Sequence, residues 1–355
     1  MRKTPLYKVH KALGAKLIDF SGWAMPLYYK TQSLEHLAVR ESAGIFDVSH
    51  MGIVDITGVD AQLFLSDVLA NDIQKTVPGK ALYSCMLNPA GGIIDDLIAY
   101  HIATNHYRLV INASRTQADW DWLSTQAKRY KVNIKQCEDF ALLALQGQKA
   151  RGILSLVLNQ PEIATLRPFS CKVFDAYTVA ATGYTGEDGF EIMLPANQAT
   201  ELWSACLDKG VMPIGLGARD SLRLEAGLNL YGLDMDETVT PLESNLSWTV
   251  AFQPEDRLFI GREALIKQQT QGIKQQLKAI KLLGKGMLRH GQQVVDANGH
   301  ALGVVTSASH SPLLQCSIGF ARVNVEVGSC FVDIRGQRLP AICAKPPLWR
   351  KAYKV

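Results

Sequence analysis

A turn-forming cluster between two apolar, β-prone runs most restricts the folds that are open to this chain. The runs cover residues 81–87 and 93–102, and Asn88-Pro89-Ala90-Gly91-Gly92 separates them. Neither strand can continue through this cluster, so the pattern predicts an antiparallel hairpin. A second turn, Thr104-Asn105-His106, leads into a strand over residues 107–112. An antiparallel sheet is therefore expected in this part of the chain.

Helices are expected between the strands. Apolar residues at helical spacing predict a helix over residues 33–43, with Gly44 as its left-handed C-terminal cap. Asp60 is the expected N-cap of a second helix, and Ser114 that of a third, which runs to about Lys128. Further strands are expected at residues 53–57, 132–134 and 140–145. This order indicates an α+β fold rather than a regular alternation with a parallel sheet.

The same kind of pattern returns at residues 173–207, where a strand, the loop 183–189, a strand over 190–194 and a helix follow one another. Two similar, ferredoxin-like split units are therefore expected. After about residue 275 helical patterns fade, and short apolar runs alternate with Gly, Asn-Gly and Pro. That change predicts an all-β C-terminal domain, a barrel or jelly roll.

Composition excludes several classes of protein. Hydrophobic residues make up 47% of the 355 residues and charged residues 20%, which is typical of an ordered globular protein. The balance of 37 basic against 33 acidic residues, 37 − 33 = +4, is too small for wholesale nucleic-acid binding. No apolar signal-peptide core follows the N-terminus, and 140–145 is typical of the longest apolar runs. A cytoplasmic protein is the expectation.

The cysteines favour the same compartment. They are odd in number, scattered, and never spaced as Cys-x-x-Cys, so they are expected to be buried thiols in a reducing environment. The seven are Cys85, Cys137, Cys171, Cys206, Cys316, Cys330 and Cys343.

Several chemistries lack their sequence motifs. Gly215-Leu216-Gly217 and Gly284-Lys285-Gly286 have Asp220 and Arg289 where a dinucleotide loop would need a third glycine. There is no Gly-x-Ser-x-Gly elbow, and the eight histidines show no tight metal-ligand spacing. Nucleotide-driven, serine-hydrolase and metal-dependent chemistry are therefore disfavoured, and no metal is expected.

Asp95 and Asp96 interrupt an otherwise apolar strand. Because strand side chains alternate between faces, the two carboxylates point to opposite sides and cannot share a proton. An aspartate beside Ile94 and Ile98 on its own face loses solvation, a cost that is tolerated mainly at functional sites. An edge-strand aspartate satisfied by the backbone or by an arginine explains the pattern equally well.

Two further segments have both an ordinary and a functional explanation. Residues 184–189 form a glycine-rich turn, after which Glu191 is unusual as an acid at the start of a strand. Residues 215–225 indicate a helix capped by Asp220, with Arg219 just outside it, and a surface ion pair is the commoner explanation there.

Basic residues gather near the C-terminal domain. Between residues 257 and 289 a single acid, Glu263, accompanies eight basic residues, namely Arg257, Arg262, Lys267, Lys274, Lys278, Lys281, Lys285 and Arg289. The tail adds Lys345, Arg350, Lys351 and Lys354. A solvated helix face accounts for most of this charge, and an acidic protein or polyanionic ligand is the alternative.

Taken in order, a series of segments resembles the aminomethyltransferase, or T-protein, family of the glycine cleavage system. The resemblance covers nearly the whole chain, from Thr4 to Pro346. The segments that carry it are Asp47-Val48-Ser49-His50-Met51, Tyr83-Ser84-Cys85-Met86-Leu87-Asn88, Gly91-Gly92-Ile93-Ile94-Asp95-Asp96-Leu97, residues 183–191, residues 215–225, Leu228-Asn229-Leu230-Tyr231-Gly232, Met235-Asp236-Glu237 and Phe259-Ile260-Gly261-Arg262-Glu263.

The resemblance implies a three-domain cloverleaf around a central cavity for tetrahydrofolate. The first α+β domain would combine residues 1–50, 140–170 and 215–270. The folate-site domain would combine 51–139 with 171–214, and 275–355 would form the all-β domain. The implied reaction moves a methylene group from an aminomethyl-lipoyl arm on the acidic H-protein to tetrahydrofolate and releases ammonia. Lipoate is carried by that partner, and neither nucleic acid nor a membrane is involved.

The resemblance also implies roles for single residues. Asp96 matches the essential aspartate of the family and would orient the attacking amine and stabilise the positive charge of iminium formation. Glu191 matches the carboxylate that pairs with the pterin, whose ring N–H and amino group suit bidentate acceptance. The other positions that match or would line the folate site are Arg219, Tyr353, Tyr83, Asn112, Tyr184 and Trp248. No reactive cysteine is required.

One departure from the family pattern and two competing functions remain. The family usually carries Gly-Thr where this chain has Ala308-Ser309, which questions the local turn because alanine resists positive φ. The main alternative is a non-enzymatic folate-binding module of the same fold, whose Lys-Gly-Cys-aromatic signature is absent. A folate domain fused to an amine-oxidising flavoprotein would need an N-terminal dinucleotide fold, which this chain lacks.

Overall fold

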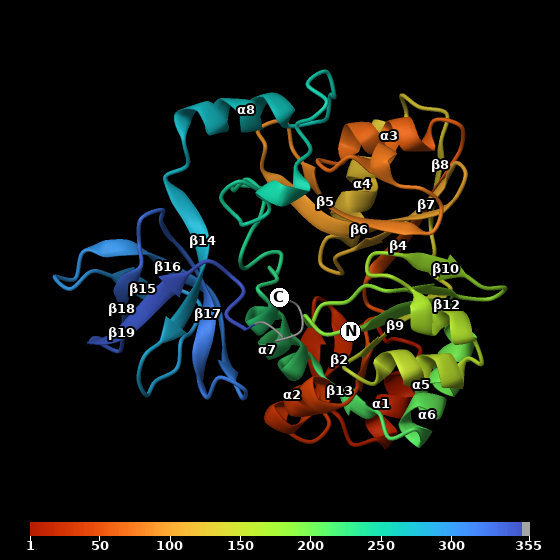
Figure 1. Ribbon diagram of the computed structural model, residues 1–355, viewed down its shortest axis with the longest axis horizontal. Helices are drawn as coiled ribbons and strands as arrows, with labels where there is room; N and C mark the ends of the chain where they lie inside the picture. Colours follow the sequence, from red (N-terminus) through yellow and green to blue (C-terminus); the bar gives the residue numbers. More distant parts are fainter. Residues whose placement is uncertain (350–355) are drawn as a thin grey trace. The chain divides into compact units, whose positions relative to one another are not determined.

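The computed structural model describes residues 1–349, and Figure 1 shows the course of the chain. Contacts divide the chain into two compact units. The first unit comprises residues 1–84, 96–183 and 187–219, and the second comprises 85–95, 184–186 and the residues from 220 onward.

A six-stranded sheet forms the centre of the first unit, in the order β10-β11-β12-β9-β3-β13. All its pairs are antiparallel except β13 with β3, which is parallel. Its strands are β3 (Gly44–Asp47), β9 (Phe140–Gln146), β10 (Cys171–Val173), β11 (Thr178–Ala180), β12 (Gly189–Pro195) and β13 (Met212–Ile214). Helices α5 (Ala150–Val157) and α6 (Ala199–Asp208) pack on it, and the core contains Ile45, Leu143, Phe190 and Trp203.

A second sheet has the order β5-β6-β7-β4-β8 and contains the expected hairpin. Its strands are β4 (Gly52–Thr57), β5 (Lys80–Leu87), β6 (Ile93–Ala103), β7 (His106–Ile111) and β8 (Asn133–Gln136). Helices α3 (Ala61–Val68) and α4 (Thr116–Ala127) pack against each other beside it (Figure 1). The remaining N-terminal elements are α1 (Tyr7–Ala12), the hairpin β1 (Lys16–Phe20) and β2 (Trp23–Tyr28), and α2 (Gln32–Glu41).

The C-terminal part of the second unit is a closed six-stranded barrel, in the order β14-β17-β16-β15-β18-β19. Pairing of β14 with β19 closes it. The strands are β14 (Gln275–Leu282), β15 (Gln293–Val295), β16 (Ala301–Ser311), β17 (Cys316–Asn324), β18 (Ser329–Ile334) and β19 (Gln337–Ala344), and α8 (Arg262–Gln271) precedes them. This confirms the expected all-β C-terminal domain within a mixed α+β fold.

The first sheet joins segments that are distant in the sequence. Strands β10, β11 and β12 join β9 in it. The pairing of β12 with β9 depends on packing between segments that are distant in the sequence, and local patterns do not reveal it.

Several helix ends also differ from the expectation. Helix α2 ends at Glu41, and Gly44 begins β3, where a Cβ would lie 2.4 Å from the Ile214 side chain. Gly44 is therefore needed for close packing rather than for a left-handed cap. Asp60 does precede α3, but its carboxylate accepts from the Lys131 amide at 2.7 Å instead of capping the helix. Helix α4 begins at Thr116, two residues after Ser114.

The substitution at 308–309 does not fall in a turn. Ala308 and Ser309 lie within β16, opposite Gly319 and Ile318 of β17. Ala308 has no positive φ, so the expected conflict does not arise. The tight position is Gly319, where a Cβ would lie 2.1 Å from the Ser307 carbonyl oxygen.

Candidate functional site

Asp96 lies on β6 with its carboxylate held on both sides. The Tyr83 hydroxyl donates to Oδ2 at 2.8 Å, and the Asn112 amide donates to Oδ1 at 2.9 Å. Asn112 Nδ2 also reaches the Asp96 carbonyl oxygen at 3.1 Å. Three of the expected site residues are thus brought together, and the carboxylate is fixed in one orientation before any ligand arrives.

The two neighbouring aspartates separate as the strand period requires. Asp95 is fully buried and Asp96 is half-buried, so they lie on opposite faces of β6. The hairpin that positions them closes as its turn sequence predicts. Asn88 donates its amide to the Gly92 carbonyl at 2.9 Å, and its side-chain oxygen accepts from the Ala90 and Gly92 amides. Gly91 adopts φ +84°, which suits glycine in such a turn.

Glu191 is the third residue of β12 and is only 8% exposed. Its Oε2 atom accepts from the Thr182 hydroxyl at 2.6 Å and from the Tyr100 hydroxyl at 3.2 Å. Within residues 1–349, no hydrogen bond reaches Oε1. A carboxylate fixed through one oxygen can offer its other oxygen to the N–H groups of a ligand.

Tyr100 bonds Glu191 and lies on the same face of β6 as Asp96. It lies four residues after Asp96, so both side chains point to the same face about 13 Å apart along the strand. Burial, and then the charge of Glu191, raise the pKa of Tyr100 well above its ordinary value. The hydroxyl therefore stays protonated and donates to Glu191.

Arg219 lies inside helix α7 (Leu216–Ala226) rather than just before a helix. The expectation that Asp220 caps this helix is wrong, because Asp220 is the fifth residue of the helix. Oε2 of the buried Glu35 accepts from the Gly215 amide at 2.8 Å, and the Gly215 carbonyl accepts the Arg219 amide at 3.1 Å. Glu35 therefore holds the residue that directly precedes the helix.

The segment 47–51 is anchored in the core of the first unit. Oδ2 of Asp47 pairs with Nε2 of the buried His10 at 2.8 Å, and Oδ1 accepts from the Ser49 amide at 2.9 Å. Burial alone would raise the pKa of Asp47, but the hydrogen bond and charge of His10 lower it below its usual value. A charged, bonded Asp47 thus holds the loop that carries His50.

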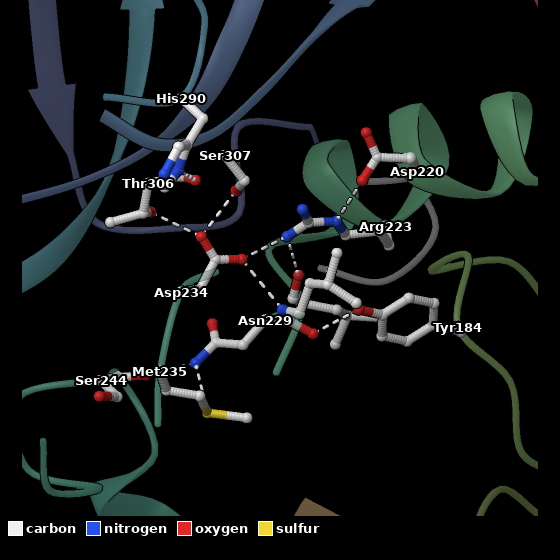
Figure 2. A network of polar contacts seen from close by, with 12 residues as sticks. Tyr184, Asp220, Arg223, Asn229, Asp234, Met235, Ser244, His290, Thr306 and Ser307 are labelled. Atoms are coloured by element: carbon white, nitrogen blue, oxygen red, sulfur yellow. Dashed lines mark hydrogen bonds and ion pairs between the residues drawn. The ribbon is translucent and has the colours of Figure 1, made fainter. Parts of the chain in front are cut away.

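The remaining expected ligand residues belong to the second unit or lie beyond the described part. The Tyr184 hydroxyl donates to the Asn229 carbonyl, both within the second unit (Figure 2). Trp248 lies in a short 3₁₀ turn, Ser247–Thr249, and is 65% exposed. Tyr353 lies outside the described residues.

Sequence reasoning missed Tyr100 and Thr182, which determine how Glu191 presents its carboxylate. The sequence could have indicated Tyr100, because it lies on the same strand face as Asp96. No such indication exists for Thr182, since its hydroxyl reaches Glu191 only through strand pairing.

The described residues contain neither a metal-binding cluster nor a membrane-spanning helix. Among residues 1–349, no three His, Cys, Asp or Glu side chains gather as they would around a metal ion. Over the same range, every helix is too short or too polar to span a membrane. The seven cysteines carry no disulfide.

Comparisons with known proteins agree on one family. A model described as the GCVT N-terminal domain matches residues 6–254, and one described as the glycine cleavage T-protein C-terminal barrel domain matches residues 275–349. An aminomethyltransferase from Legionella pneumophila is 51% identical over 358 residues, covering 99% of each chain. One from Francisella tularensis subsp. holarctica is 47% identical over 349 residues, covering 98% of this chain and 97% of the relative.

A solved structure has the same fold. The glycine cleavage system aminomethyltransferase T from Bartonella henselae superposes with a TM-score of 0.93 at 35% identity, and the match covers 98% of each chain.

Proposed function

The chain belongs to the glycine cleavage T-protein family, and from that membership we propose the following reaction. The protein transfers the methylene carbon of an aminomethyl-dihydrolipoyl arm, carried by H-protein, to tetrahydrofolate. The products are 5,10-methylene-tetrahydrofolate, ammonia and dihydrolipoyl H-protein. The relatives that match over the full length are named as aminomethyltransferases, which favours the enzyme over the non-enzymatic folate-binding module.

The arrangement around Asp96 is the observation that supports the proposed chemistry. Asp96 is a carboxylate clamped by Tyr83 and Asn112, on the same strand face as the tyrosine that holds Glu191. In this proposal the Glu191 carboxylate, whose Oε1 carries no hydrogen bond within residues 1–349, accepts the N–H donors of the pterin, and Asp96 lies beside the reacting nitrogens. A pre-oriented carboxylate stabilises the positive charge that develops there without reorganising.

The atoms of the reaction balance without a metal or redox group. The bond between the lipoyl sulfur and the methylene carbon breaks, and the sulfur takes a proton. The bond between the amine and the same carbon also breaks, and the amine leaves as ammonia with a second proton. Two folate nitrogens bond the carbon, and each of them loses one proton. Asp96 would orient the folate amine for attack. We assign it positioning and charge stabilisation rather than a large share of the proton transfer.

Arg219, Tyr184, Trp248 and Tyr353 complete the proposed ligand set, on the strength of the family resemblance. The basic residues near the barrel, such as Lys281 and Lys285, would face the acidic H-protein. The unpaired thiols support a reducing compartment, and we propose the cytoplasm.

The test is a reconstituted turnover. Purified protein is mixed with tetrahydrofolate and aminomethyl-loaded H-protein, and ammonia and methylene-folate are followed together. We expect one-for-one formation in the wild type. In Asp96→Asn we expect a loss of turnover of about 100-fold or more, with folate affinity kept.

The variant is nearly the same size, and the Tyr83 hydroxyl can rotate to accept from its amide. Asp121→Asn, which changes an exposed acid on α4, serves as the matched control. Tight folate binding by the wild type without either product would instead support the non-enzymatic folate module.

A further inference from the structure

His50 belongs to a motif that the proposed reaction leaves without a role. It lies between β3 and β4 and is 4% exposed. Its Nδ1 atom is buried without a hydrogen-bond partner, and within residues 1–349 neither ring nitrogen bonds to the protein. A buried, unpaired imidazole is costly, which is a reason to look for a ligand.

The surroundings of His50 keep it neutral. The ring meets Phe20 edge-on, with centroids 5.5 Å apart and planes at 84°. Burial and then the positive charge of Arg219 lower the pKa of His50 to about 4, while Asp47 opposes them. A neutral imidazole has one N–H and one lone pair, so it can accept a hydrogen bond at neutral pH.

Strand register places His50 at the same end of the sheet as Asp96. Gly52, two residues after His50, opposes Ile111 at the end of β7. The next residue along is Asn112, which donates to Asp96. The positive charge of Arg219, another expected ligand residue, also acts on His50.

We propose that His50 is a further ligand-binding residue, whose imidazole accepts a hydrogen bond from an N–H of bound tetrahydrofolate. This inference rests on the proposed function. At this end of the sheet Asn112 already donates to Asp96, and His50 supplies a neutral acceptor. A neutral acceptor can hold a ring N–H without adding a second negative charge beside Asp96.

The direct test is NMR of protein labelled with ¹⁵N at histidine, during titration with tetrahydrofolate and without H-protein. The signals of His50 are assigned from their loss in His50→Gln. We expect the His50 nitrogen signals to shift on binding, while those of exposed His300 stay in place. A merely structural histidine would not respond in this way.

Affinities of two variants give a second readout. His50→Phe, which removes the acceptor, should weaken tetrahydrofolate binding about tenfold. His50→Gln keeps an acceptor and should recover part of that loss, and His300→Gln should bind like the wild type. If the wild type binds folate while its His50 signals stay fixed and His50→Phe binds equally well, the inference is overturned and the proposed function stands. If the wild type does not bind folate, the proposed function itself fails.

An independent observation concerns two cysteines of the barrel. The sulfur atoms of Cys330, on β18, and Cys343, on β19, lie 3.7 Å apart, and both side chains are buried. Cys330 opposes Ala341, and the Cys343 amide donates to the Gly328 carbonyl at 2.7 Å. The two thiols therefore point to the same face of the paired strands.

The geometry points to a redox-sensitive pair, in which peroxide links Cys330 and Cys343 as a disulfide between β18 and β19. One thiolate attacks a peroxide oxygen and becomes a sulfenic acid, releasing water. The second sulfur then displaces the sulfenic oxygen as another water, so two thiols and one hydrogen peroxide give one disulfide and two waters. Closure brings the sulfurs from 3.7 Å to about 2 Å, a small movement.

The test treats the full chain with hydrogen peroxide, blocks remaining thiols after unfolding, and analyses the peptides by mass spectrometry. We expect a linked peptide pair containing Cys330 and Cys343, lost on reduction and absent in Cys343→Ser. Buried Cys206 should remain a free thiol. Recovery of Cys330 and Cys343 only as separate blocked or sulfinic forms would overturn the assignment.

Discussion

At the scale of single residues, the carboxylate of Glu191 is shaped by its neighbours. Both hydroxyl donors meet on Oε2, which leaves Oε1 available. Without these two donors, the side chain of Glu191 could rotate, and its buried carboxylate would lack hydrogen bonds that replace water. In the proposed site, the affinity for folate would therefore depend on Thr182 and Tyr100, which hold Glu191.

Replacing Tyr100 tests that dependence. Tyr100→Phe removes one donor to a charged group, so we expect tetrahydrofolate to bind about tenfold to a hundredfold more weakly. Tyr107→Phe is the matched control, because Tyr107 is equally buried on the neighbouring strand but does not contact Glu191. Equal affinities of the two variants, measured by calorimetry, would contradict this role of Tyr100.

The lowered pKa of His50 predicts how the stability of the folded protein depends on pH. This pKa falls from 6.5 to about 4 on folding, first through burial and then through Arg219. Below about pH 6.5, His50 binds a proton in the unfolded chain, but in the folded protein it binds one only near pH 4. Stability should therefore be fully present above that window and fall as the pH drops through it, by roughly 3 kcal/mol from this group.

The measurement is denaturant unfolding of the wild type and His50→Gln at pH 7 and pH 4.5. The variant lacks the titrating group, so we expect it to lose less stability than the wild type on acidification. Equal losses in the two proteins would show that His50 is not held neutral.

At the scale of elements, the end of helix α7 depends on a buried ion pair in the second unit. Arg223 Nη1 donates to Asp234 Oδ2 at 2.6 Å, and the hydroxyls of Thr306 and Ser307 reach Oδ1 at 2.6 Å each (Figure 2). Burial would lower the pKa of Arg223, but the charge of Asp234 raises it, so the guanidinium stays charged. Asp234 thereby joins this helix to strand β16.

Two acids on the same arginine allow a matched comparison. Asp234→Asn removes the buried counter-charge of Arg223 and leaves only the partly exposed Asp220, so we expect a loss of about 3–5 kcal/mol in the free energy of unfolding. Asp220 also bonds Arg223, at 2.9 Å, but its side chain is 39% exposed. Asp220→Asn should therefore cost less than about 1 kcal/mol. Denaturant unfolding of both variants checks the ranking, and a reversed order would refute it.

Some helices and strands could be predicted from local sequence patterns, and others could not. The hairpin at 81–102 and the barrel strands after residue 275 were predicted because turn residues and alternation act within a few positions. The start of α7 at Leu216 was not, and the residue before it, Gly215, is held by Glu35, 180 residues away. Gly44 was misassigned for a similar reason, since its requirement comes from the Ile214 side chain.

At the scale of the whole molecule, the expected ligand residues are distributed over both compact units. Asp96, Glu191 and Arg219 belong to the first, whereas Tyr184 and Trp248 belong to the second. The division into three domains that the resemblance implied stays a prediction. The charge of the chain is also uneven, with its basic residues concentrated near the barrel.

Charge reversal tests that basic region as the H-protein contact. The double change Lys281→Glu and Lys285→Glu should weaken binding of H-protein and flatten its dependence on salt, because fewer opposite charges are screened. Lys128→Glu, at the end of α4, provides a control on another exposed basic residue. Unchanged affinity and salt dependence in the double variant would remove these lysines from the interface.

The amino-acid sequence was enough to predict the hairpin at 81–102, the α+β class, the all-β C-terminal part and the family. It also determined that Asp95 and Asp96 face opposite ways. These features depend on periodicity, turn chemistry and motif order, which act over short stretches. Only the folded protein shows that β12 pairs with β9, that Tyr100 donates to Glu191 across 91 positions, and that His50 is buried. Hydrogen bonds and packing between segments distant in sequence are energetically decisive there, and no local pattern records them.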